Sequence, residues 1–514
     1  MKDGKAARTV GVMAVIILLA KFMGLFRETM LAGLYGQGME SDILNTATQI
    51  PLLFFDMVLG VAILSTFVPV FNSRLSTQGK DAAMAFADNF ITVSATLAMI
   101  LALLGILFAE PLVRLMTPGY AQIPGKVEET ARLLRNLFPS IVFTAVAYVA
   151  VGILQSFGEF TIPSLISVVS NGVMIVYLWL FGNRLGLVGV VVSMLIAWAL
   201  QLVVQLPYLR KFEYRYRFRF DIKDSGLREA GKLAVPVLIS SWIQPLCNVI
   251  NMAFGSSLGD GAVSALNWAN KIYIIMVGVF AYAITNFIFP KLSRLSGDGE
   301  EECFSQITRL SVGWILFLIG LICGLFLALA EPIIQVVFQR GAFTPEDTAT
   351  CATALFCYSF GMLGYGVCEV LNKSFYAIRD GKTPMFSSVL GIIVNLGGAF
   401  VLTGLMHRGI GGLALSSALS SVSIALCLMI MMNRRRPGVF HLEFIINVGK
   451  ILVCTAVTFF VAKLVYPMTA VFAGGMIATL FRLCLAALPA CVAYIGIAVI
   501  LRVTETEVLM RKRG

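Results

Sequence analysis

The feature that most constrains this chain is a series of long apolar runs. A helix that crosses a bilayer needs about 20 apolar residues, and runs of that length recur from one end of the sequence to the other. They fall at residues 10–34, 45–72, 84–108, 132–157, 161–182, 185–209, 232–257, 265–290, 307–329, 350–377, 384–405, 411–432, 444–466 and 472–501. We therefore predict an all-α polytopic membrane protein with about 14 transmembrane helices.

Composition excludes several functional classes. Of the 514 residues, 58% are apolar and 13% are charged, whereas soluble domains average about 45–50% and 25%. A water-soluble enzyme, a disordered chain and a nucleic-acid-binding module are thereby excluded. The ten cysteines form no CxxC pair, and the two histidines, His407 and His441, lie near span ends. We therefore expect neither a metal site nor a cofactor.

Charge in the loops predicts the orientation. The net charge is +11. If the N-terminus is cytoplasmic, 23 loop Lys and Arg residues lie inside and seven lie outside. Because cytoplasmic loops carry the excess of cations, we expect both termini in the cytoplasm.

Two parts of the sequence repeat each other. Ala109-Glu-Pro111 recurs as Ala330-Glu-Pro332, 221 residues later, and Pro163 and Pro384 keep the same offset. Six helices per repeat is an even number, so both copies enter the membrane in the same sense. Parallel repeats of this kind predict two lobes around a central cavity that alternates its access. We expect an N-lobe at residues 1–222, a C-lobe at 223–436, and two extra helices with a basic tail at 437–514.

Ionisable residues inside apolar runs predict a hydrophilic cavity, because each costs about 2.5–3.5 kcal/mol in the bilayer and usually faces water or a partner. Lys21, Arg27 and Lys271 would suit an anionic substrate group. Glu369 and Lys373 form either part of this cavity or an i,i+4 structural pair. The predicted lining residues are Lys21, Arg27 and Glu28 in the run 10–34; Asp42 just before the run 45–72, with Asn45, Gln49 and Asp56 inside it; Gln244, Asn248 and Asn251 in the run 232–257; Asn267 and Lys271 in the run 265–290; and Glu369 and Lys373 in the run 350–377.

The linker between the lobes alternates aromatic and basic residues over Tyr214-Arg-Tyr-Arg-Phe-Arg-Phe220. Such a pattern is compatible with RNA binding. We favour an interfacial linker whose rings lie at headgroup depth while its arginines meet anionic lipid. No nucleic-acid partner is therefore expected.

Several motifs resemble those of one family of exporters. In the first half they are Lys21-Phe-Met-Gly24-Leu-Phe-Arg27-Glu28, Tyr35-Gly36, Asp42, Pro51 and Phe67-Val-Pro-Val-Phe71; in the second half they are Arg340-Gly-Ala-Phe343, Ser374-Phe-Tyr-Ala377, Asp380-Gly-Lys-Thr-Pro384 and Asn395. Together they resemble the MurJ (MviN) lipid II flippase family of the multidrug/oligosaccharidyl-lipid/polysaccharide exporter superfamily. The resemblance covers nearly the whole chain.

The resemblance implies a transporter, not an enzyme, in the bacterial plasma (inner) membrane. It would move undecaprenyl-diphosphate-linked peptidoglycan precursor to the outer leaflet for cell-wall synthesis and cell shape. Its substrate would be bound by Arg27, Glu28 and Asp42, with Lys21 and Lys271 standing where many members have Arg. Phe55-Asp56 replaces an arginine pair of many members. The last two helices would hold the polyprenyl tail.

We expect alternating access driven by the membrane potential or by an ion gradient, with no assigned coupling cation. Lipid II and membrane lipids are the expected partners, and the chain is expected to be a monomer. A related exporter of another lipid-linked oligosaccharide and a drug or cation antiporter are the alternatives. A membrane-embedded glycosyltransferase is disfavoured because the outer loops are short.

Overall fold

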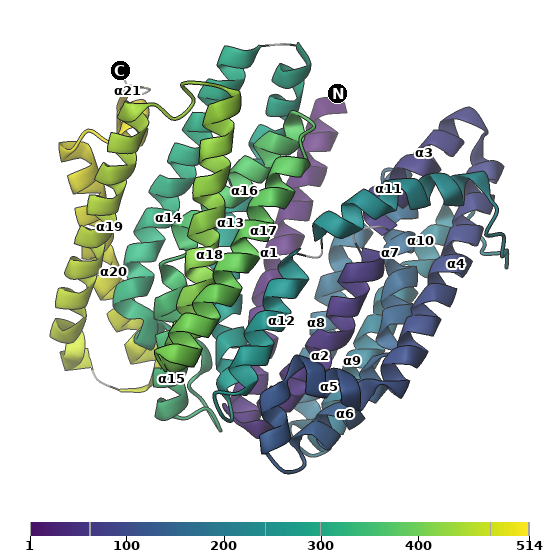
Figure 1. The fold of residues 1–514 in the computed structure, drawn as a ribbon, viewed down its shortest axis with the longest axis horizontal. Helices are drawn as coiled ribbons and strands as arrows, with labels where there is room; N and C mark the ends of the chain where they lie inside the picture. The colour runs from purple at the N-terminus through teal and green to yellow at the C-terminus, as the bar shows by residue number, and fades with distance from the viewer. Residues whose placement is uncertain (1, 61–62, 242, 299, 473, 512–514) are drawn as a thin grey trace. The chain divides into compact units, whose positions relative to one another are not determined.

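Helices make up all the regular structure of the described chain (Figure 1). The computed structural model describes residues 2–60, 63–241, 243–298, 300–472 and 474–511. The predicted all-α class is confirmed. The physical reason is that only a helix or a closed barrel satisfies its own backbone hydrogen bonds within lipid.

The chain forms two compact units, Met1–Val263 and Ser264–Gly514. The predicted lobe boundaries at residues 222 and 436 come from the sequence repeat, and they stay predictions.

The first unit consists of twelve α-helices and three short turns of other helix types among its described residues. In chain order these are α1 (Lys2–Tyr35), α2 (Met39–Phe55), η1 (Asp56–Gly60), η2 (Ile63–Phe67), α3 (Val68–Thr77), α4 (Lys80–Leu107), α5 (Ala109–Met116), η3 (Pro118–Gln122), α6 (Lys126–Leu137), α7 (Ser140–Ser156), α8 (Thr161–Phe181), α9 (Gly186–Val203), α10 (Leu206–Lys211), α11 (Ser225–Ser241) and α12 (Ile243–Ser256).

The second unit contains the remaining helices of the described chain. They are α13 (Ala262–Asp298), α14 (Glu301–Phe338), α15 (Pro345–Ser359), α16 (Met362–Ala377), α17 (Lys382–Ala399), η4 (Phe400–Leu405), α18 (Gly409–Arg435), α19 (Leu442–Met468), η5 (Thr469–Phe472), α20 (Gly475–Ile500) and α21 (Thr504–Arg511). The first two residues of α13 belong to the preceding unit.

Eleven helical segments of the described residues are long and apolar enough to cross a membrane, and the bent pair α15–α16 makes a twelfth. The other two predicted runs, 10–34 and 232–257, also fall on helices, namely α1 and the pair α11–α12. All predicted runs therefore coincide with helices. The exact count of 14 spans stays a prediction.

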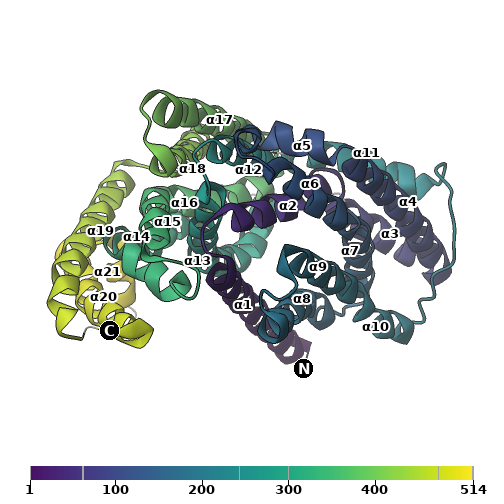
Figure 2. The same cartoon turned by 90° about the horizontal axis from the view of Figure 1, so that it is seen from below.

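Close helix packing in the first unit brings α1 against α8 and α8 against α9 (Figure 2). Asn171 of α8 donates a hydrogen bond from Nδ2 to the carbonyl oxygen of Ala20, at 3.2 Å. Its side chain also lies opposite Gly24, where an added Cβ would stand 3.5 Å away. These contacts fix the part of α1 that carries the charged residues.

Helix α2 is followed by two π-helical segments, η1 and η2. Asp56 is the first residue of η1. A Cβ on Gly60 would lie 2.9 Å from the ring of Phe55 and 3.1 Å from Oδ1 of Asp56. The absence of a side chain at Gly60 therefore leaves room for the side chains of Phe55 and Asp56 in this π-helical turn. Single π-helical turns often occur at functional sites.

The repeat has a counterpart in the backbone. Phe108, just before Ala109-Glu-Pro111, has φ −99° and ψ 21°. Leu329, just before Ala330-Glu-Pro332, has φ −119° and ψ 22° and interrupts α14. The two copies of the motif thus follow the same local break in the helix, as expected if each prolyl ring excludes a regular helical turn before it.

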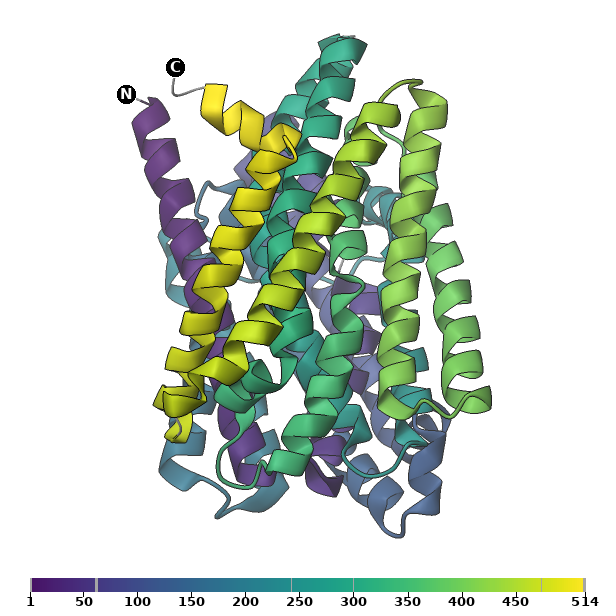
Figure 3. The same cartoon turned by 90° about the vertical axis from the view of Figure 1, so that its left-hand side faces the viewer.

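The last two long helices, α19 and α20, pack along each other and against α14 (Figure 3). Tyr494 of α20 donates a hydrogen bond to the carbonyl oxygen of Phe317 in α14, at 2.6 Å. Gly324 of α14 faces Thr455 and Thr458 of α19, and a Cβ there would lie 2.7 Å from the Thr455 carbonyl oxygen. Small residues at such positions allow helices to approach closely in a membrane.

Candidate functional site

Helix α1 carries a partly exposed arginine that retains unused hydrogen-bond donors. Arg27 Nη2 lies 2.5 Å from Glu28 Oε1, and the Arg27 side chain is 26% exposed while that of Glu28 is 7% exposed. The Arg27 Nε atom is buried and has no hydrogen-bond partner among the described residues. A guanidinium offers five donors in a planar fork, so the exposed part of this group can bind an additional anionic oxygen, whereas the buried Nε atom cannot reach one in this conformation. Lys21, six residues earlier on the same helix, is half-buried.

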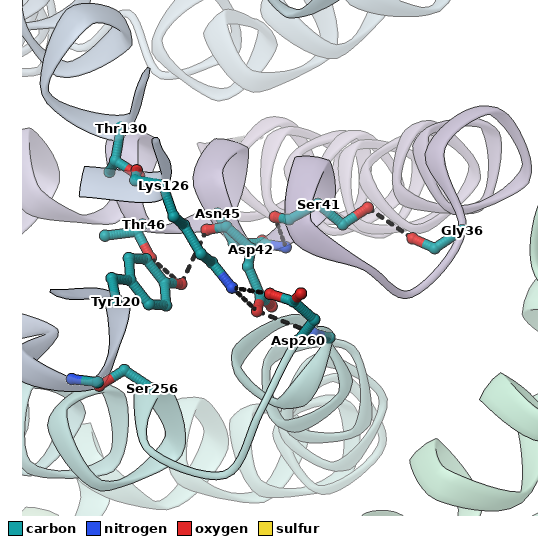
Figure 4. Close-up of polar contacts among 12 residues, drawn as sticks. Gly36, Ser41, Asp42, Asn45, Thr46, Tyr120, Lys126, Thr130, Ser256 and Asp260 are labelled. Atoms are coloured by element: carbon teal, nitrogen blue, oxygen red, sulfur yellow. Dashed lines mark hydrogen bonds and ion pairs between the residues drawn. The ribbon is translucent and has the colours of Figure 1, made fainter. Parts of the chain in front are cut away.

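A buried ion cluster lies where α2, η3 and α6 begin (Figure 4). This end of the first unit is opposite the N-terminus of α1 (Figure 1). Lys126 Nζ lies 2.9 Å from Asp42 Oδ2 and 2.6 Å from Asp260 Oδ1. The side chains of Asp42 and Lys126 are fully buried, whereas that of Asp260 is 47% exposed. The backbone N–H of Gly261 also donates to Asp42 Oδ2, at 2.9 Å.

Tyr120 completes this ion cluster. Its ring centroid lies 4.2 Å from Lys126 Nζ, and its hydroxyl lies 2.9 Å from Thr46 Oγ1 and 3.3 Å from the carbonyl oxygen of Asp42. Burial, followed by the nearby Asp42 carboxylate, raises the pKa of Tyr120 well above its usual value. Tyr120 therefore remains a neutral hydrogen-bonding group at any physiological pH.

Asp42 was predicted to line a substrate cavity, and its three partners, Lys126, Tyr120 and Asp260, were not predicted. In the structure Asp42 is enclosed and ion-paired. One signal was available: Lys126 is the first residue of α6, where a cation opposes the positive end of the helix dipole. A lysine at such a position indicates a specific partner. The partners themselves, Asp42 and Asp260, lie in segments far from Lys126 in the sequence. The periodicity of a single helix cannot identify them.

The other predicted polar residues of α2 are half-buried: Asn45, Gln49 and, in η1, Asp56. Asn45 Nδ2 donates to the carbonyl oxygen of Ser41 at 2.9 Å. Phe55, at the site of the replaced arginine pair, is 2% exposed and packs edge-on against Tyr148 with ring centroids 5.2 Å apart. Phe55 is thus a packing residue. Of the two residues Phe55 and Asp56, only Asp56 has a polar side chain.

In α12, Asn248 and Asn251 are half-buried. The side chain of Gln244 lies outside the described residues. Helices α11 and α12 pack within the first unit, where α12 contacts α5 and η3. At this contact Gly119 donates its N–H to Ser256 Oγ, at 3.1 Å.

In the second unit, the predicted residues lie on α13 and α16. Asn267 and Lys271 of α13 are half-buried, as are Glu369 and Lys373 of α16. Tyr365 hydrogen-bonds the Glu369 carboxylate, and the charge of Lys373 acts on it. Lys373 Nζ also lies 5.7 Å from the ring centroid of Phe289. A cavity role for these residues stays a prediction.

Within the described ranges, no group of three His, Cys, Asp or Glu side chains could hold a metal ion. The described chemistry consists of paired charges and polar side chains within apolar helices. This combination defines a multi-pass helical membrane protein. The same fold occurs in an inward-facing multidrug resistance MATE family transporter, with a TM-score of 0.70, 14% identity, and coverage of 83% of this chain and 98% of that structure.

The profile of the family described as "Lipid II flippase MurJ" matches residues 31–485. The chain therefore belongs to the MurJ family, as the resemblance in its motifs predicted, and it is a multi-pass membrane protein of a family of transporters. The predicted family and fold class are confirmed.

Relatives with curated names agree with this assignment. A probable lipid II flippase MurJ of Rickettsia prowazekii is 28% identical over 78% of this chain and 79% of its own length. A lipid II flippase MurJ of Burkholderia cenocepacia is 27% identical over 85% of this chain and 86% of its own length. A solved structure of lipid II flippase MurJ in an inward closed conformation has a TM-score of 0.80 and 21% identity, and it covers 95% of this chain and 98% of its own.

Proposed function

We propose that this protein is a lipid II flippase of the bacterial inner membrane. It moves the undecaprenyl-diphosphate-linked peptidoglycan precursor from the cytoplasmic to the outer leaflet by alternating access. Membership of the MurJ family over residues 31–485 supports the substrate class. The polyprenyl tail can remain in lipid, because only the polar headgroup loses hydration on crossing the hydrocarbon.

The observation that carries the proposal is the state of Arg27. Glu28 holds only one guanidinium nitrogen, Nη2, at 2.5 Å, and the Arg27 side chain is 26% exposed. A diphosphate needs charged donors in fixed positions, and Arg provides bidentate recognition of phosphate oxygens. Lys21 and Lys271 are the further proposed cations, as point charges without the planar fork. Glu28 then acts as the positioning residue for Arg27.

The loop charges support a cytoplasmic location of both termini, with 23 loop cations on that side and seven on the other. In this orientation the ion cluster of Asp42, Lys126 and Asp260 lies at the outer end of the first unit. Asp42 and Lys126 are fully buried at this end. We propose that opening toward the outside releases the loop at residues 257–261 from Asp42 and Lys126.

The proposed energy source is the membrane potential or an ion gradient. A potential that is negative inside favours outward movement of an anion by about 2.3 kcal/mol per charge per 100 mV. The proposal includes no cofactor, a monomeric chain and no nucleic-acid partner. The coupling cation is left unassigned.

The test uses bacteria depleted of their own lipid II flippase and expressing this chain. A toxin that cleaves lipid II is added outside, and cleavage of labelled headgroups is measured. We expect cleavage with the wild-type chain and at least a tenfold loss with Arg27→Ala at equal membrane levels. Arg114→Ala is the control, because Arg114 is 51% exposed and pairs with Glu110 on the same helix.

Normal cleavage with Arg27→Ala would contradict the role of Arg27. No cleavage with the wild-type chain at normal membrane levels would contradict lipid II transport, and it would favour an exporter of another lipid-linked oligosaccharide within the same fold.

A further inference from the structure

The linker between α10 and α11 alternates basic and aromatic residues, and the proposed transport cycle does not use them. Residues 213–220 form no helix. The chain passes along the first turns of α4 before α11 begins (Figure 2). The alternating residues therefore lie on a non-helical segment that runs beside α4.

Four hydrogen bonds attach this segment to a single stretch of α4. The Tyr214 hydroxyl donates to Asp88 Oδ1 at 2.7 Å, and the Tyr216 hydroxyl lies 2.8 Å from Thr92 Oγ1. At the other end of the linker, Asn89 forms a reciprocal pair with the backbone of Asp221, with both distances 2.8 Å. Residues 214–221 form no β-strand; for their single, non-helical run we use the name linker strand. This segment is thus fixed to residues 88–92.

The sequence of α4 places these attachment points in the bilayer. Its charged residues are Lys80, Asp81 and Asp88, and the 18 residues from Phe90 to Leu107 carry no charge. At about 1.5 Å per residue this stretch is about 27 Å long, close to the roughly 30 Å of the hydrocarbon core. The linker strand therefore crosses α4 at the boundary between hydrocarbon and headgroups.

The side chains that the linker strand exposes are suited to this boundary. Phe218 is 79% exposed and Phe220 is 47% exposed. Arg215, Arg217 and Arg219 are exposed and form no ion pair within the part of the chain that the structure describes. Aromatic rings are favoured at headgroup depth, and arginine binds phosphate through its planar fork.

We propose that the linker strand is a binding site for the phosphate headgroups of anionic phospholipids. Arg215, Arg217 and Arg219 bind the phosphates, and Phe218 and Phe220 insert beside the upper acyl chains. An RNA partner is disfavoured, because the exposed rings lie next to an uncharged membrane-spanning stretch, where bases would have to leave water. This inference depends on the chain spanning a bilayer and is independent of which substrate is transported.

The test uses the full-length protein reconstituted in bilayers of phosphatidylcholine with a minor fraction of phosphatidylglycerol. The protein is extracted in mild detergent, and the ratio of the two retained lipids is measured by mass spectrometry. We expect phosphatidylglycerol to be enriched on the wild-type protein. Because each cation near a membrane surface contributes a several-fold preference for anionic lipid, the variant Arg215→Gln/Arg217→Gln/Arg219→Gln should lose at least about tenfold of this enrichment.

The matched control is Arg379→Gln/Lys382→Gln/Arg434→Gln, which removes the same charge from three other exposed cations. It should keep most of the enrichment, and both variants should unfold at the wild-type temperature because the altered side chains are exposed. A second variant, Phe218→Ser/Phe220→Ser, should weaken retention while leaving the charge unchanged.

Equal enrichment on the wild-type protein and on the linker variant would overturn the proposal. So would an equal loss in the control, which would mean that any surface cation attracts the lipid. Capture of single-stranded RNA by the wild-type protein without enrichment of phosphatidylglycerol would assign the linker strand to RNA instead.

Discussion

Lys126 shows how one residue in an unfavourable position reveals a tertiary contact. As the first residue of α6 it faces the positive end of a helix dipole, and it is fully buried. The carboxylates of Asp42 and Asp260 and the ring face of Tyr120 compensate for the unfavourable dipole and for the loss of hydration. Removing a single partner from a buried pair is costly, because the remaining charge is left without compensation.

We therefore expect Lys126→Met to lower the free energy of unfolding by about 3–5 kcal/mol. The double variant Lys126→Met/Asp42→Asn should recover part of this loss, since it also removes the buried carboxylate. Thermal and denaturant unfolding of the full chain in detergent would measure both. Arg132→Met on the same helix is the control: Arg132 is 58% exposed, so its change should stay below about 1 kcal/mol. Wild-type stability of Lys126→Met would show that the pair is not needed.

Asp380 predicts a pH dependence at the start of α17. Burial acts to raise its pKa, but hydrogen bonds from Thr383 and the charge of Arg435 outweigh burial and hold the pKa below its usual value. Arg435 Nη2 lies 2.8 Å from Asp380 Oδ2. Since the folded state favours the ionised form, this stabilisation is complete above the unfolded pKa of about 3.9. It is lost as the pH falls through the lower folded value.

Asp380→Asn should thus be less stable than wild type by about 1 kcal/mol at pH 6–7, with the difference disappearing as the pH falls below about 4. Unfolding temperatures of both proteins across this pH range would measure the effect. Arg434→Gln, at an exposed neighbour of Arg435, should show no such dependence. A difference that grew toward acid pH would contradict the assigned sign.

At the scale of elements, the contact between α16 and α18 depends on a glycine. A Cβ on Gly364 would lie 2.8 Å from the backbone of Ser421 and Val422. Backbone atoms on the partner helix cannot move aside as a side chain can. A methyl group there must therefore push the two helices apart.

We expect Gly364→Ala to lower the free energy of unfolding by about 1–3 kcal/mol. The control is Gly449→Ala on α19, where an added Cβ meets nothing within 4 Å. That change should stabilise the helix by about 0.5–1 kcal/mol, because alanine restricts the unfolded chain. The comparison is made by thermal unfolding in the same detergent. The packing argument would be contradicted if both variants changed the free energy of unfolding by the same amount and in the same direction, or if Gly364→Ala had no effect.

At the scale of the whole molecule, the proposed transport of an anionic headgroup predicts a response to voltage. Outward flipping should become several-fold faster when a potential that is negative on the donor side is imposed, because each charge gains about 2.3 kcal/mol per 100 mV. Proteoliposomes with a potassium diffusion potential and a fluorescent lipid II probe, quenched from outside, would measure the rate. Arg27→Ala should flip slowly with or without the potential. A wild-type rate independent of voltage would exclude this energy source.

The helices of this protein could be predicted from the sequence, whereas the contacts of the ion cluster could not. Each predicted apolar run coincides with a helix, because length and hydropathy are local properties of the chain. The pairing of Arg27 with Glu28 follows from adjacent residues. The enclosure of Asp42 by Lys126 and Asp260 joins three distant segments, and no periodicity in one helix specifies that contact.

By itself the sequence determined the all-helical membrane class, the family, the internal repeat and the positions of the charged residues, since all of these depend on composition, motifs and spacing along the chain. Only the tertiary structure decided which charges are satisfied. It left Arg27 with an unused donor, enclosed Asp42 in an ion cluster, and fixed the linker strand to α4. The reason is physical: the fate of a charge depends on the neighbours that meet it in space, and packing alone brings those neighbours together.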